Sequence, residues 1–278
     1  MRILADLLFP PKCPACGELL PYRGFFGAKE EKSSALCAEC TSLWKKEKEE
    51  LCGICGESVA NCLCATKTMQ SAGCNCFCKL VYYRPGNKEE VGNRIVYRIK
   101  DHNERAAVLF LAQELSREIR KCMGRETWKG KSFFLCYLPR RSRAVLEGGS
   151  DQAKELAVEL AKRLELPFLP LIGRRQKSQT PQKFLTVSGR LSNATEAFYL
   201  VEKRKDEAAG KVAILVDDIV TSGASMTAGI RLLRRAGASD FLAVAVASDE
   251  CNKNPKIKAP ETRSEYDRIY ERLIHMRK

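Results

Sequence analysis

Beyond residue 70 the chain alternates between short apolar runs and longer amphipathic stretches. In residues 103–124 the apolar positions recur every fourth residue, at Ala107, Leu111, Leu115 and Ile119, which is typical of a helix with one buried face. The pattern predicts strands at residues 77–83, 132–139, 166–172, 211–216 and 240–248, and helices at residues 103–124, 151–164 and 222–236. Strands that alternate with helices form parallel sheets, which bind ligands at the carboxyl ends of their strands. We therefore expect an α/β fold built on a parallel sheet.

Residues 1–70 lack this alternation and carry cysteines in close pairs. Two such pairs can place four thiolates around one ion, the arrangement that structural zinc prefers. The paired cysteines are Cys13, Cys16, Cys37, Cys40, Cys52, Cys55, Cys62 and Cys64. Gly17 and Gly56 each follow a pair and supply the permissive backbone that a metal-binding turn needs. The spacing predicts two structural zinc ions in a reducing compartment, rather than a disulfide scaffold.

The order of the ligands leaves two arrangements open. In the simpler one the first four cysteines bind one ion and the last four bind the other, whereas in an interleaved one the pairs alternate. Cys62 and Cys64 form the least regular pair, because one residue separates them where two separate the others. Neither arrangement leaves a position for water, so we expect no catalytic zinc and a module that folds on its metal. Phe25, Phe26 and Trp44 are interpreted as the core of this module, with base stacking as the alternative.

Three further cysteines, Cys74, Cys76 and Cys78, alternate along the chain, which is the spacing of residues on one face of a strand. We interpret them as small buried residues, with a third metal site as the alternative. The remaining cysteines are isolated and are expected to be structural; they are Cys122, Cys136 and Cys251.

The segment from Val212 to Gly229 joins an apolar strand to a helix through a polar loop. Asp217 and Asp218 end the strand, and we expect a turn here because a straight strand would direct the two acids to opposite faces. Backbone N–H groups, hydroxyls and the positive helix end then form a phosphate cradle, in which Gly223 permits close approach of the anion. The candidate binding residues are Asp217, Asp218, Ile219, Val220, Thr221, Ser222, Gly223, Ala224 and Ser225. The carboxylates suit the paired hydroxyls of a ribose, and the GxxxxGK[ST] pattern of a P-loop is absent.

Charge is distributed unevenly along the chain. Residues 1–80 hold 10 basic and 9 acidic residues, so nearly all of the net charge of +14 lies in residues 81–278. A basic domain favours polyanions such as phosphorylated metabolites, DNA or RNA, with a merely solvated surface as the alternative. No apolar run is long enough to span a membrane, and residues 1–9 suit a short docking helix rather than a signal peptide. We expect a cytoplasmic protein.

The apolar strand, acid pair and Thr-Ser-Gly-Ala-Ser turn of residues 212–225 resemble the signature of type I phosphoribosyltransferases. Together with the paired cysteines, the chain resembles the ComF competence-protein family, in which a double zinc ribbon precedes a phosphoribosyltransferase domain. Further residues that match this family are Lys100, Pro139, Arg140, Arg141, Arg174, Gln182, Arg190 and Asn193. One loop departs from the family, because residues 148–152 read Gly-Gly-Ser-Asp-Gln and only Gln152 matches. We expect a zinc ribbon over residues 1–70, a phosphoribosyltransferase-like domain over 71–251 and a charged tail over 252–278.

The resemblance implies a site for phosphoribosyl diphosphate with Mg²⁺. Asp217 and Asp218 would hold the ribose hydroxyls, and residues 221–225 the 5′-phosphate. Arg140 and Arg141 would contact the pyrophosphate. The resemblance also implies a role in DNA uptake during natural competence, with single-stranded DNA and a DNA-uptake helicase as partners. The alternative is an active phosphoribosyltransferase in nucleotide metabolism or salvage, and the sequence leaves open both the acceptor and whether transfer occurs.

Overall fold

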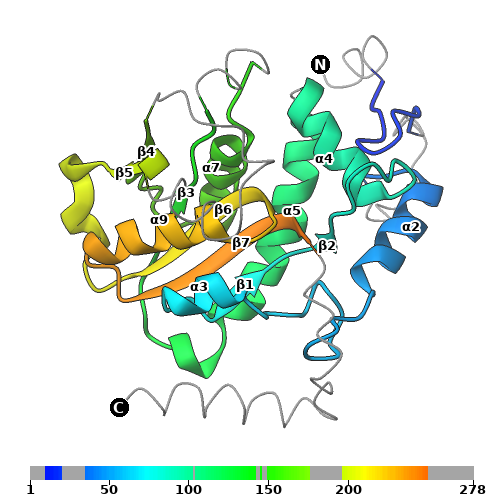
Figure 1. Cartoon of the computed structure of the whole chain (residues 1–278). Coiled ribbons are helices and arrows are strands. Elements are labelled where there is room, and N and C mark those ends of the chain that lie inside the picture. The colour runs from blue at the N-terminus through cyan, green and yellow to red at the C-terminus, as the bar shows by residue number, and fades with distance from the viewer. Residues whose placement is uncertain are drawn as a thin grey trace.

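The sheet at the centre of the protein is parallel throughout (Figure 1). The computed structural model describes residues 10–20, 35–102, 104–141, 145, 149–175 and 196–249. The strands run in the order β1–β7–β6–β3, and β2 follows β1 alongside β7. Their bounds are β1 Cys76–Cys78, β2 Val81–Tyr82, β3 Phe133–Tyr137, β6 Val212–Val220 and β7 Asp240–Ser248. The predicted α/β class is confirmed, and parallel pairing brings the carboxyl ends of the strands to one edge.

Helices cover both faces of this sheet (Figure 1). Two pack on one face, α5 and α7, and two on the other, α3 and α9. Their bounds are α3 Lys67–Ser71, α5 Arg105–Met123, α7 Gln152–Leu164 and α9 Ala224–Arg235. Strand β6 contributes to both cores: Val212, Ile214 and Val216 join the α5 side. Ala213 and Leu215 join the α9 side, so residues 212–216 of this strand are all apolar because both of its faces are buried there.

A smaller antiparallel pair lies beside α9, with β4 at Ile172–Arg174 and β5 at Phe198–Leu200. The strand predicted over residues 166–172 is therefore displaced toward the carboxyl side. Within that range Phe168 makes only an isolated parallel bridge to Leu135. Pro167 and Pro170 lack the N–H groups that a continuous ladder needs, which is the physical reason for the break. Short 3-10 helices lie at Glu126–Trp128 and Glu202–Ala208.

The N-terminal part that bears the paired cysteines packs onto the sheet domain (Figure 1). We call its described residues, 10–20 and 35–66, the cysteine lobe. Its helix α2 (Ala38–Lys48) lies against α4 (Val91–His102). The ring of Trp44 meets that of Phe110 on α5 edge-on at 5.4 Å. Trp44 is therefore buried between the lobe and the domain, whereas the sequence predicted it in a core of the lobe alone.

Polar contacts complete this junction. Trp44 Nε1 donates to the Glu114 carboxylate at 3.1 Å, and Lys48 Nζ lies 2.8 Å from the same carboxylate. Glu47 accepts hydrogen bonds from the first two N–H groups of α4, those of Val91 and Gly92, at 2.6 and 2.8 Å. A carboxylate at this end of a helix satisfies otherwise unpaired donors and complements the helix dipole. Contacts from the lobe therefore help to stabilise the sheet domain.

The predicted helices 103–124, 151–164 and 222–236 and the strand 240–248 correspond closely to α5, α7, α9 and β7. The strand predicted over residues 77–83 is broken into β1 and β2 at Lys79–Leu80. Helix α4 was not predicted, although the buried residues Val91, Ile95 and Ile99 have helical spacing. None of the helices in the described part of the chain has the length and apolar character of a membrane span.

The cysteines outside the two groups of paired cysteines are buried, as predicted, wherever the structure describes them. Cys76 and Cys78 share the core on the α5 side, but Cys74 belongs to the core on the α9 side. The prediction that all three share one face is therefore wrong, because β1 begins only at Cys76 and the alternation does not extend back to Cys74. Cys122 and Cys136 are buried in opposite cores, while Cys251 and the predicted docking helix of residues 1–9 lie outside the described residues.

Candidate functional site

The two acids of β6 lie inside the strand rather than after it. β6 stays in register with β7 to its last residue, with Asp217 opposite Ala245 and Val220 opposite Ser248. The predicted turn at the acids is therefore wrong, because β7 supplies backbone partners along the whole of β6. The acids nevertheless stay close together, since the backbone N–H of Asp218 donates to the Asp217 carboxylate at 2.9 Å.

Burial and one lysine set the charge of this acid pair. Burial raises the pKa of Asp217 well above its ordinary range, and the negative charge of Asp218 raises it further. Lys100, on α4, opposes this shift and places its ammonium 3.2 Å from the Asp218 carboxylate. Closely spaced carboxylates of this kind hold a proton more readily than isolated ones, and they can accept hydrogen bonds from neighbouring hydroxyls of a ligand.

The loop after β6 leads into the amino end of α9. Gly223 precedes the helix with φ +77°, a left-handed conformation that favours glycine, and because glycine has no side chain it cannot cap the helix. A Cβ at this position would lie 2.3 Å from Thr66 Oγ1 and 2.9 Å from Thr68 Oγ1, so the backbone is tightly packed from behind. The first N–H groups of α9 have no intrahelical partner and can bind an anion. Ser225, in this first turn, is half-buried.

Arginine side chains gather near the acid pair. Arg174, at the end of β4, donates to the carbonyl of Pro139 at 3.2 Å. Burial lowers the pKa of Arg174, the positive charge of Arg141 lowers it further, and the carboxylate of Asp217 opposes both. Arg141 and Arg174 therefore lie within electrostatic reach of each other and of the acids. Like charges held side by side favour an anion that can bridge them.

Arg140 is oriented by the start of α7. Its backbone N–H donates to the Asp151 carboxylate at 3.1 Å, and its guanidinium donates to the side-chain oxygen of Gln152. Asp151 also caps α7 by accepting from the N–H of Lys154 at 3.3 Å. Gln152, which matches the family in an otherwise divergent loop, thus has a physical role in holding Arg140. Three other family-matched residues lie outside the described part of the chain: Gln182, Arg190 and Asn193.

The cysteine lobe contains two turns of the same construction. In one, the N–H of Gly17 donates to Cys13 O at 2.8 Å; in the other, the N–H of Gly56 donates to Cys52 O at 2.9 Å. Both glycines have positive φ, +79° and +73°, as predicted for turns that present two thiols to one ion. The turns are closed by antiparallel bridges between residues 12 and 19 and between residues 51 and 58.

Four sulfur atoms converge at each turn. The first cluster is Cys13, Cys16, Cys37 and Cys40, and the second cluster is Cys52, Cys55, Cys62 and Cys64. Within each cluster the Sγ atoms lie within 4.8 Å of one another, which suits a tetrahedral ion with sulfur at about 2.3 Å. The sequential arrangement is the one that the structure adopts. Both clusters could hold zinc, and among the described residues they are the only groups of three or more His, Cys, Asp or Glu side chains with ligand spacing.

The second cluster has a buried lysine beside it. Contacts with neighbouring thiols raise the pKa of Cys64 well above its ordinary range, so four thiolates need a cation among them. Lys79 is fully buried, and its ammonium lies 3.3 Å from Cys62 Sγ and 5.0 Å from the ring centroid of Phe77. A four-thiolate zinc carries two negative charges, and this ammonium offsets part of that charge.

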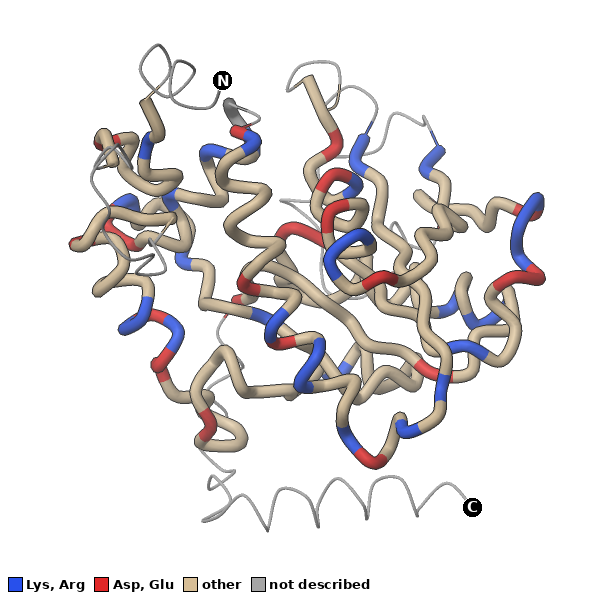
Figure 2. The backbone as a smooth tube through the Cα atoms, turned by 180° about the vertical axis from the view of Figure 1, so that it is seen from behind, with Lys and Arg blue, Asp and Glu red and all other residues tan. Residues whose placement is uncertain are grey.

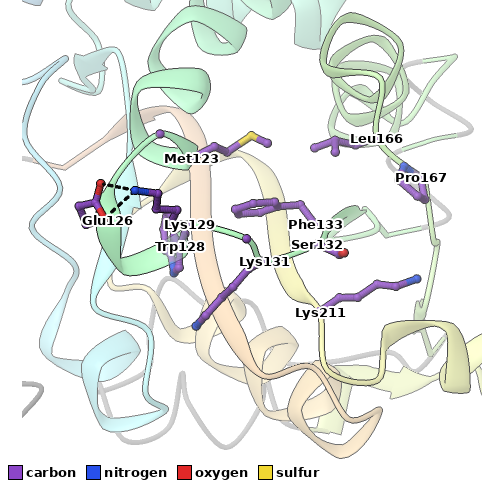
Figure 3. Close-up of a pocket in the computed structure, with 12 residues that line it drawn as sticks. Met123, Glu126, Trp128, Lys129, Lys131, Ser132, Phe133, Leu166, Pro167 and Lys211 are labelled. Carbon is purple, nitrogen blue, oxygen red and sulfur yellow. Dashed lines mark hydrogen bonds and ion pairs between the residues drawn. The ribbon is translucent and has the colours of Figure 1, made fainter.

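An open pocket of about 610 Å³ lies elsewhere, around the amino ends of β3 and β6 (Figure 3). Lys129, Lys131 and Lys211 stand at its edge. Two of these lysines are paired, Lys129 with Glu126 at 3.3 Å and Lys131 with Asp240 at 3.5 Å. Because ligands of parallel sheets bind at the carboxyl ends of the strands, this pocket is separate from the candidate site.

Two parts of the site escaped the sequence-based prediction. Thr66 and Thr68 contact the turn at Gly223 from the segment that leaves the cysteine lobe. A threonine before a short helix is a capping signal, but nothing in the sequence indicates that the helix lies against the phosphate cradle. The second part is α4, which carries Lys100 to the acid pair.

Residues 144–268 match the family "Phosphoribosyl transferase domain". The match includes β6, the loop with Gly223, α9 and β7, and therefore the acid pair and the candidate anion cradle. The chain carries a phosphoribosyltransferase-type domain behind its cysteine lobe.

The chain is also similar to Competence protein F of Haemophilus influenzae, with 33% identity over 93 residues. The aligned stretch is 34% of this chain and covers about two fifths, 40%, of the length of that relative. Together with the domain match and the cysteine clusters, this similarity confirms the resemblance to the ComF competence-protein family.

The solved structures to which the chain shows some similarity include a hypoxanthine phosphoribosyltransferase from Staphylococcus aureus, with a TM-score of 0.32 and 12% identity over 56% of this chain and 68% of the other. An adenine phosphoribosyltransferase from Leishmania donovani has a TM-score of 0.31 and 16% identity over 63% of this chain and 80% of the other. The assignment to the phosphoribosyltransferase-type fold rests on the domain match and the sheet topology.

Proposed function

We propose that the protein binds phosphoribosyl diphosphate with Mg²⁺ at the carboxyl edge of its sheet. The observation that carries the proposal is that an acid pair and an uncapped helix end follow one another in a single strand–loop–helix unit, β6 to α9. The carboxylates of Asp217 and Asp218 accept hydrogen bonds from the ribose hydroxyls. The backbone of residues 221–225 binds the 5′-phosphate at the positive end of the helix.

The pyrophosphate belongs next to the arginines in this proposal. Arg140 and Arg141 follow β3, and Gln152 holds the guanidinium of Arg140 in place. Arg174 adds a third positive charge within reach of Arg141 and Asp217. Mg²⁺ binds through one or two carboxylates plus substrate phosphates, and it neutralises the charge on the diphosphate. The acid pair offers the carboxylates, so the residues present fit a cation that arrives with the ligand.

Transfer would place further demands on the same residues. As the bond from C1′ to the pyrophosphate breaks, positive charge grows on the sugar and negative charge on the leaving group. Carboxylates at the ribose and arginines at the pyrophosphate stabilise these charges, so positioning and electrostatics would supply most of the catalysis. An enzyme of this type requires an acceptor, and release of pyrophosphate in a panel of bases distinguishes it from a protein that only binds the metabolite.

The proposed cellular role is DNA uptake in natural competence, which the similarity to Competence protein F supports. Single-stranded DNA is the proposed nucleic-acid partner, because residues 81–278 carry nearly all of the net charge of +14. Figure 2 shows Lys and Arg spread over most of the described elements, with Asp and Glu interspersed among them. Such a distribution favours weak, sequence-independent binding to phosphates. A DNA-uptake helicase is the proposed protein partner, and the cytoplasm the proposed location.

Calorimetry with phosphoribosyl diphosphate and Mg²⁺ tests the binding site. We expect the wild type to bind and Asp217→Ala combined with Asp218→Ala to abolish binding, because the double variant leaves no carboxylate in β6. Both side chains are only half-buried, although they lie inside β6, so the double variant should retain the fold. Asp206→Ala, at an exposed acid of the 3-10 helix 202–208, is the matched control. Unchanged affinity in a folded double variant would contradict the assignment of the acids.

DNA binding is tested on the whole chain, because β1 and the cysteine lobe contribute to the fold. Affinity for single-stranded DNA should fall with salt, with a log–log slope of roughly −0.7 for each phosphate neutralised. The double acid variant should bind DNA at least as well as the wild type, since carboxylates repel phosphates. Competition by phosphoribosyl diphosphate would place DNA on the arginines of the candidate site, and no competition would place it elsewhere. Absence of DNA binding at low salt would reject the DNA part of the proposal.

A further inference from the structure

A short segment connects the second cysteine cluster to the phosphate cradle. Cys62 and Cys64 belong to the second cluster. The backbone of Cys64 also forms an isolated antiparallel β-bridge with that of Cys76, at the start of β1. Helix α3 (Lys67–Ser71) begins three residues later and packs against α9. Only Ala65 and Thr66 separate the last cluster cysteine from this helix. The cluster is therefore tied to α3 by a link of only two residues.

A chain of hydrogen bonds joins α3 to the cradle. The hydroxyl of Thr68 donates to the carbonyl of Ser222 at 2.7 Å. That hydroxyl has a single hydrogen, so the contact of 2.9 Å between the two threonine hydroxyls must be a donation from Thr66 to Thr68. Thr66 in turn accepts from the N–H of Met69 at 3.3 Å and caps α3. The sequence of donors thus runs from the backbone of α3, through two hydroxyls, to the backbone of the cradle.

Packing holds the same turn in place. A Cβ at Gly223 would approach both threonine hydroxyls and also Met69 Cγ, at 3.2 Å. Gly223 and Met69 are buried. Below the turn, the hydroxyl of buried Thr227 donates to Gly223 O at 2.9 Å, so the turn is fixed from the α9 side as well. The turn between Ser222 and the first N–H groups of α9 therefore has its geometry set by α3 on one side and by α9 on the other.

We propose that Thr66 and Thr68 are positioning residues for the phosphate cradle and that the second cysteine cluster anchors them. This inference rests on the proposed binding of phosphoribosyl diphosphate. Neither threonine contacts the ligand. They hold the Ser222 carbonyl and the Gly223 turn so that the N–H groups of the first turn of α9 converge on one phosphate. Loss of the second cluster frees the segment and loosens the cradle, whereas loss of the first cluster leaves this connection intact.

A pair of substitutions at Thr68 separates hydrogen bonding from packing. Thr68→Val keeps the shape of the side chain and removes the donor to Ser222, whereas Thr68→Ser keeps the donor and removes a methyl group. We expect Thr68→Val to weaken binding of phosphoribosyl diphosphate about three- to tenfold, because one hydrogen bond that orders the cradle is lost. Thr68→Ser should bind within about twofold of the wild type. Equal loss in both variants, or loss in neither, would overturn the positioning role.

Hydrogen exchange reports on the cradle without any ligand. In Thr68→Val the amides of residues 221–225 should exchange faster than in the wild type, and in Thr68→Ser they should not. If the wild type fails to bind phosphoribosyl diphosphate, the proposed function fails, but exchange still decides the inference. Unchanged exchange in Thr68→Val would overturn it even if the wild type binds.

The cysteine clusters provide the second comparison. Cys64→Ser removes a ligand of the second cluster, and Cys16→Ser removes an exposed ligand of the first. Each should lose about one metal equivalent by elemental analysis. Only Cys64→Ser should accelerate exchange in residues 221–225 and weaken binding of phosphoribosyl diphosphate, measured below the melting temperature of each variant. Equal effects of the two substitutions on the cradle would show that the second cluster is not a specific anchor.

Discussion

The cysteine lobe and the carboxyl edge of the sheet differ in how their charged side chains are arranged. At the lobe, charges meet partners: Lys48 pairs with Glu114 at 2.8 Å, and Arg84 pairs with Glu50 at 2.5 Å. At the carboxyl edge like charges also stand together, Asp217 beside Asp218 and Arg141 near Arg174, although Lys100 pairs with Asp218 at 3.2 Å. The first arrangement stabilises a junction. The second is costly without a ligand and is typical of a site that binds charged groups.

The two regions should also respond differently when a side chain or a metal ion is removed. The lobe is held by metal ligands and by a tryptophan that crosses to α5, so removing a part should cost stability. The edge is held by the sheet on which it lies, so removing a charge should cost binding and leave stability equal or higher. Substitutions at four positions, with control variants, test this contrast.

Loss of metal should have the largest effect. We expect about two zinc ions per chain by elemental analysis, and unfolding of the lobe on chelation, because structural zinc contributes on the order of 10 kcal/mol to small metal-dependent folds. Cys13→Ser should retain about one ion and melt at a lower temperature. Cys122→Ser, at a buried cysteine outside both clusters, should retain both ions. Less than one ion per chain in reducing conditions would contradict the assignment of the clusters.

Substitution of Trp44 should have the second-largest effect. Trp44→Ala removes a buried indole packed on Phe110 and should lower the free energy of unfolding by about 3–5 kcal/mol in urea denaturation. Trp44→Phe keeps an aromatic ring but removes the donor to Glu114, and about 1–3 kcal/mol should be lost. If Trp44→Ala destabilised the lobe while the sheet domain melted as in the wild type, the two regions would not share a core.

Local patterns in the sequence predicted most of the fold. The apolar runs of β3, β6 and β7 and the helical periodicity of α5 were sufficient, because each element is buried against the same sheet. The cysteine spacing predicted both clusters, because ligand pairs are close in sequence and need only one turn each. Residues 166–172 misled the prediction because two prolines interrupt an otherwise apolar run.

What the sequence did not predict depends on contacts between distant segments. The straight course of β6 through Asp217 and Asp218 is set by β7, whose length provides partners up to Val220. Trp44 was placed in the wrong core because its partner, Phe110, lies 66 residues away and on the other side of the junction. The role of Thr68 depends on Ser222, which lies 154 residues away in the sequence. Such contacts follow from the assembled fold and leave no periodic pattern.

Replacing the buried lysine should have a smaller, localised effect. Lys79→Met keeps the bulk of the side chain but removes the ammonium beside Cys62 Sγ. Groups that contact metal ligands commonly change metal affinity by about 10- to 100-fold, so the second cluster should release its ion that much more readily to a chelator. The first cluster should release its ion at the wild-type level, which makes it the internal control. Equal weakening of both sites would show a general loss of stability instead.

Neutralising one acid of the edge should have the smallest effect, and its sign should be opposite. Burial and Asp218 raise the pKa of Asp217 in the folded protein, so between the ordinary carboxyl pKa of about 4 and the raised value the folded state holds a proton that the unfolded chain has released.

The stability that the protonated Asp217 contributes to the folded state is present at low pH and is lost as the pH rises through the raised pKa. Asp217→Asn is neutral throughout and should accept the hydrogen bond from the Asp218 N–H through its side-chain oxygen. The melting temperature of the variant should therefore equal that of the wild type near pH 3. At pH 8 it should be about 2–4 °C higher, if removing the charge stabilises the fold by about 1 kcal/mol. It should bind phosphoribosyl diphosphate more weakly, while Asp206→Asn should change neither property. A lower melting temperature for Asp217→Asn at pH 8 would show that the acid pair stabilises the fold, and the contrast between the two regions would fail.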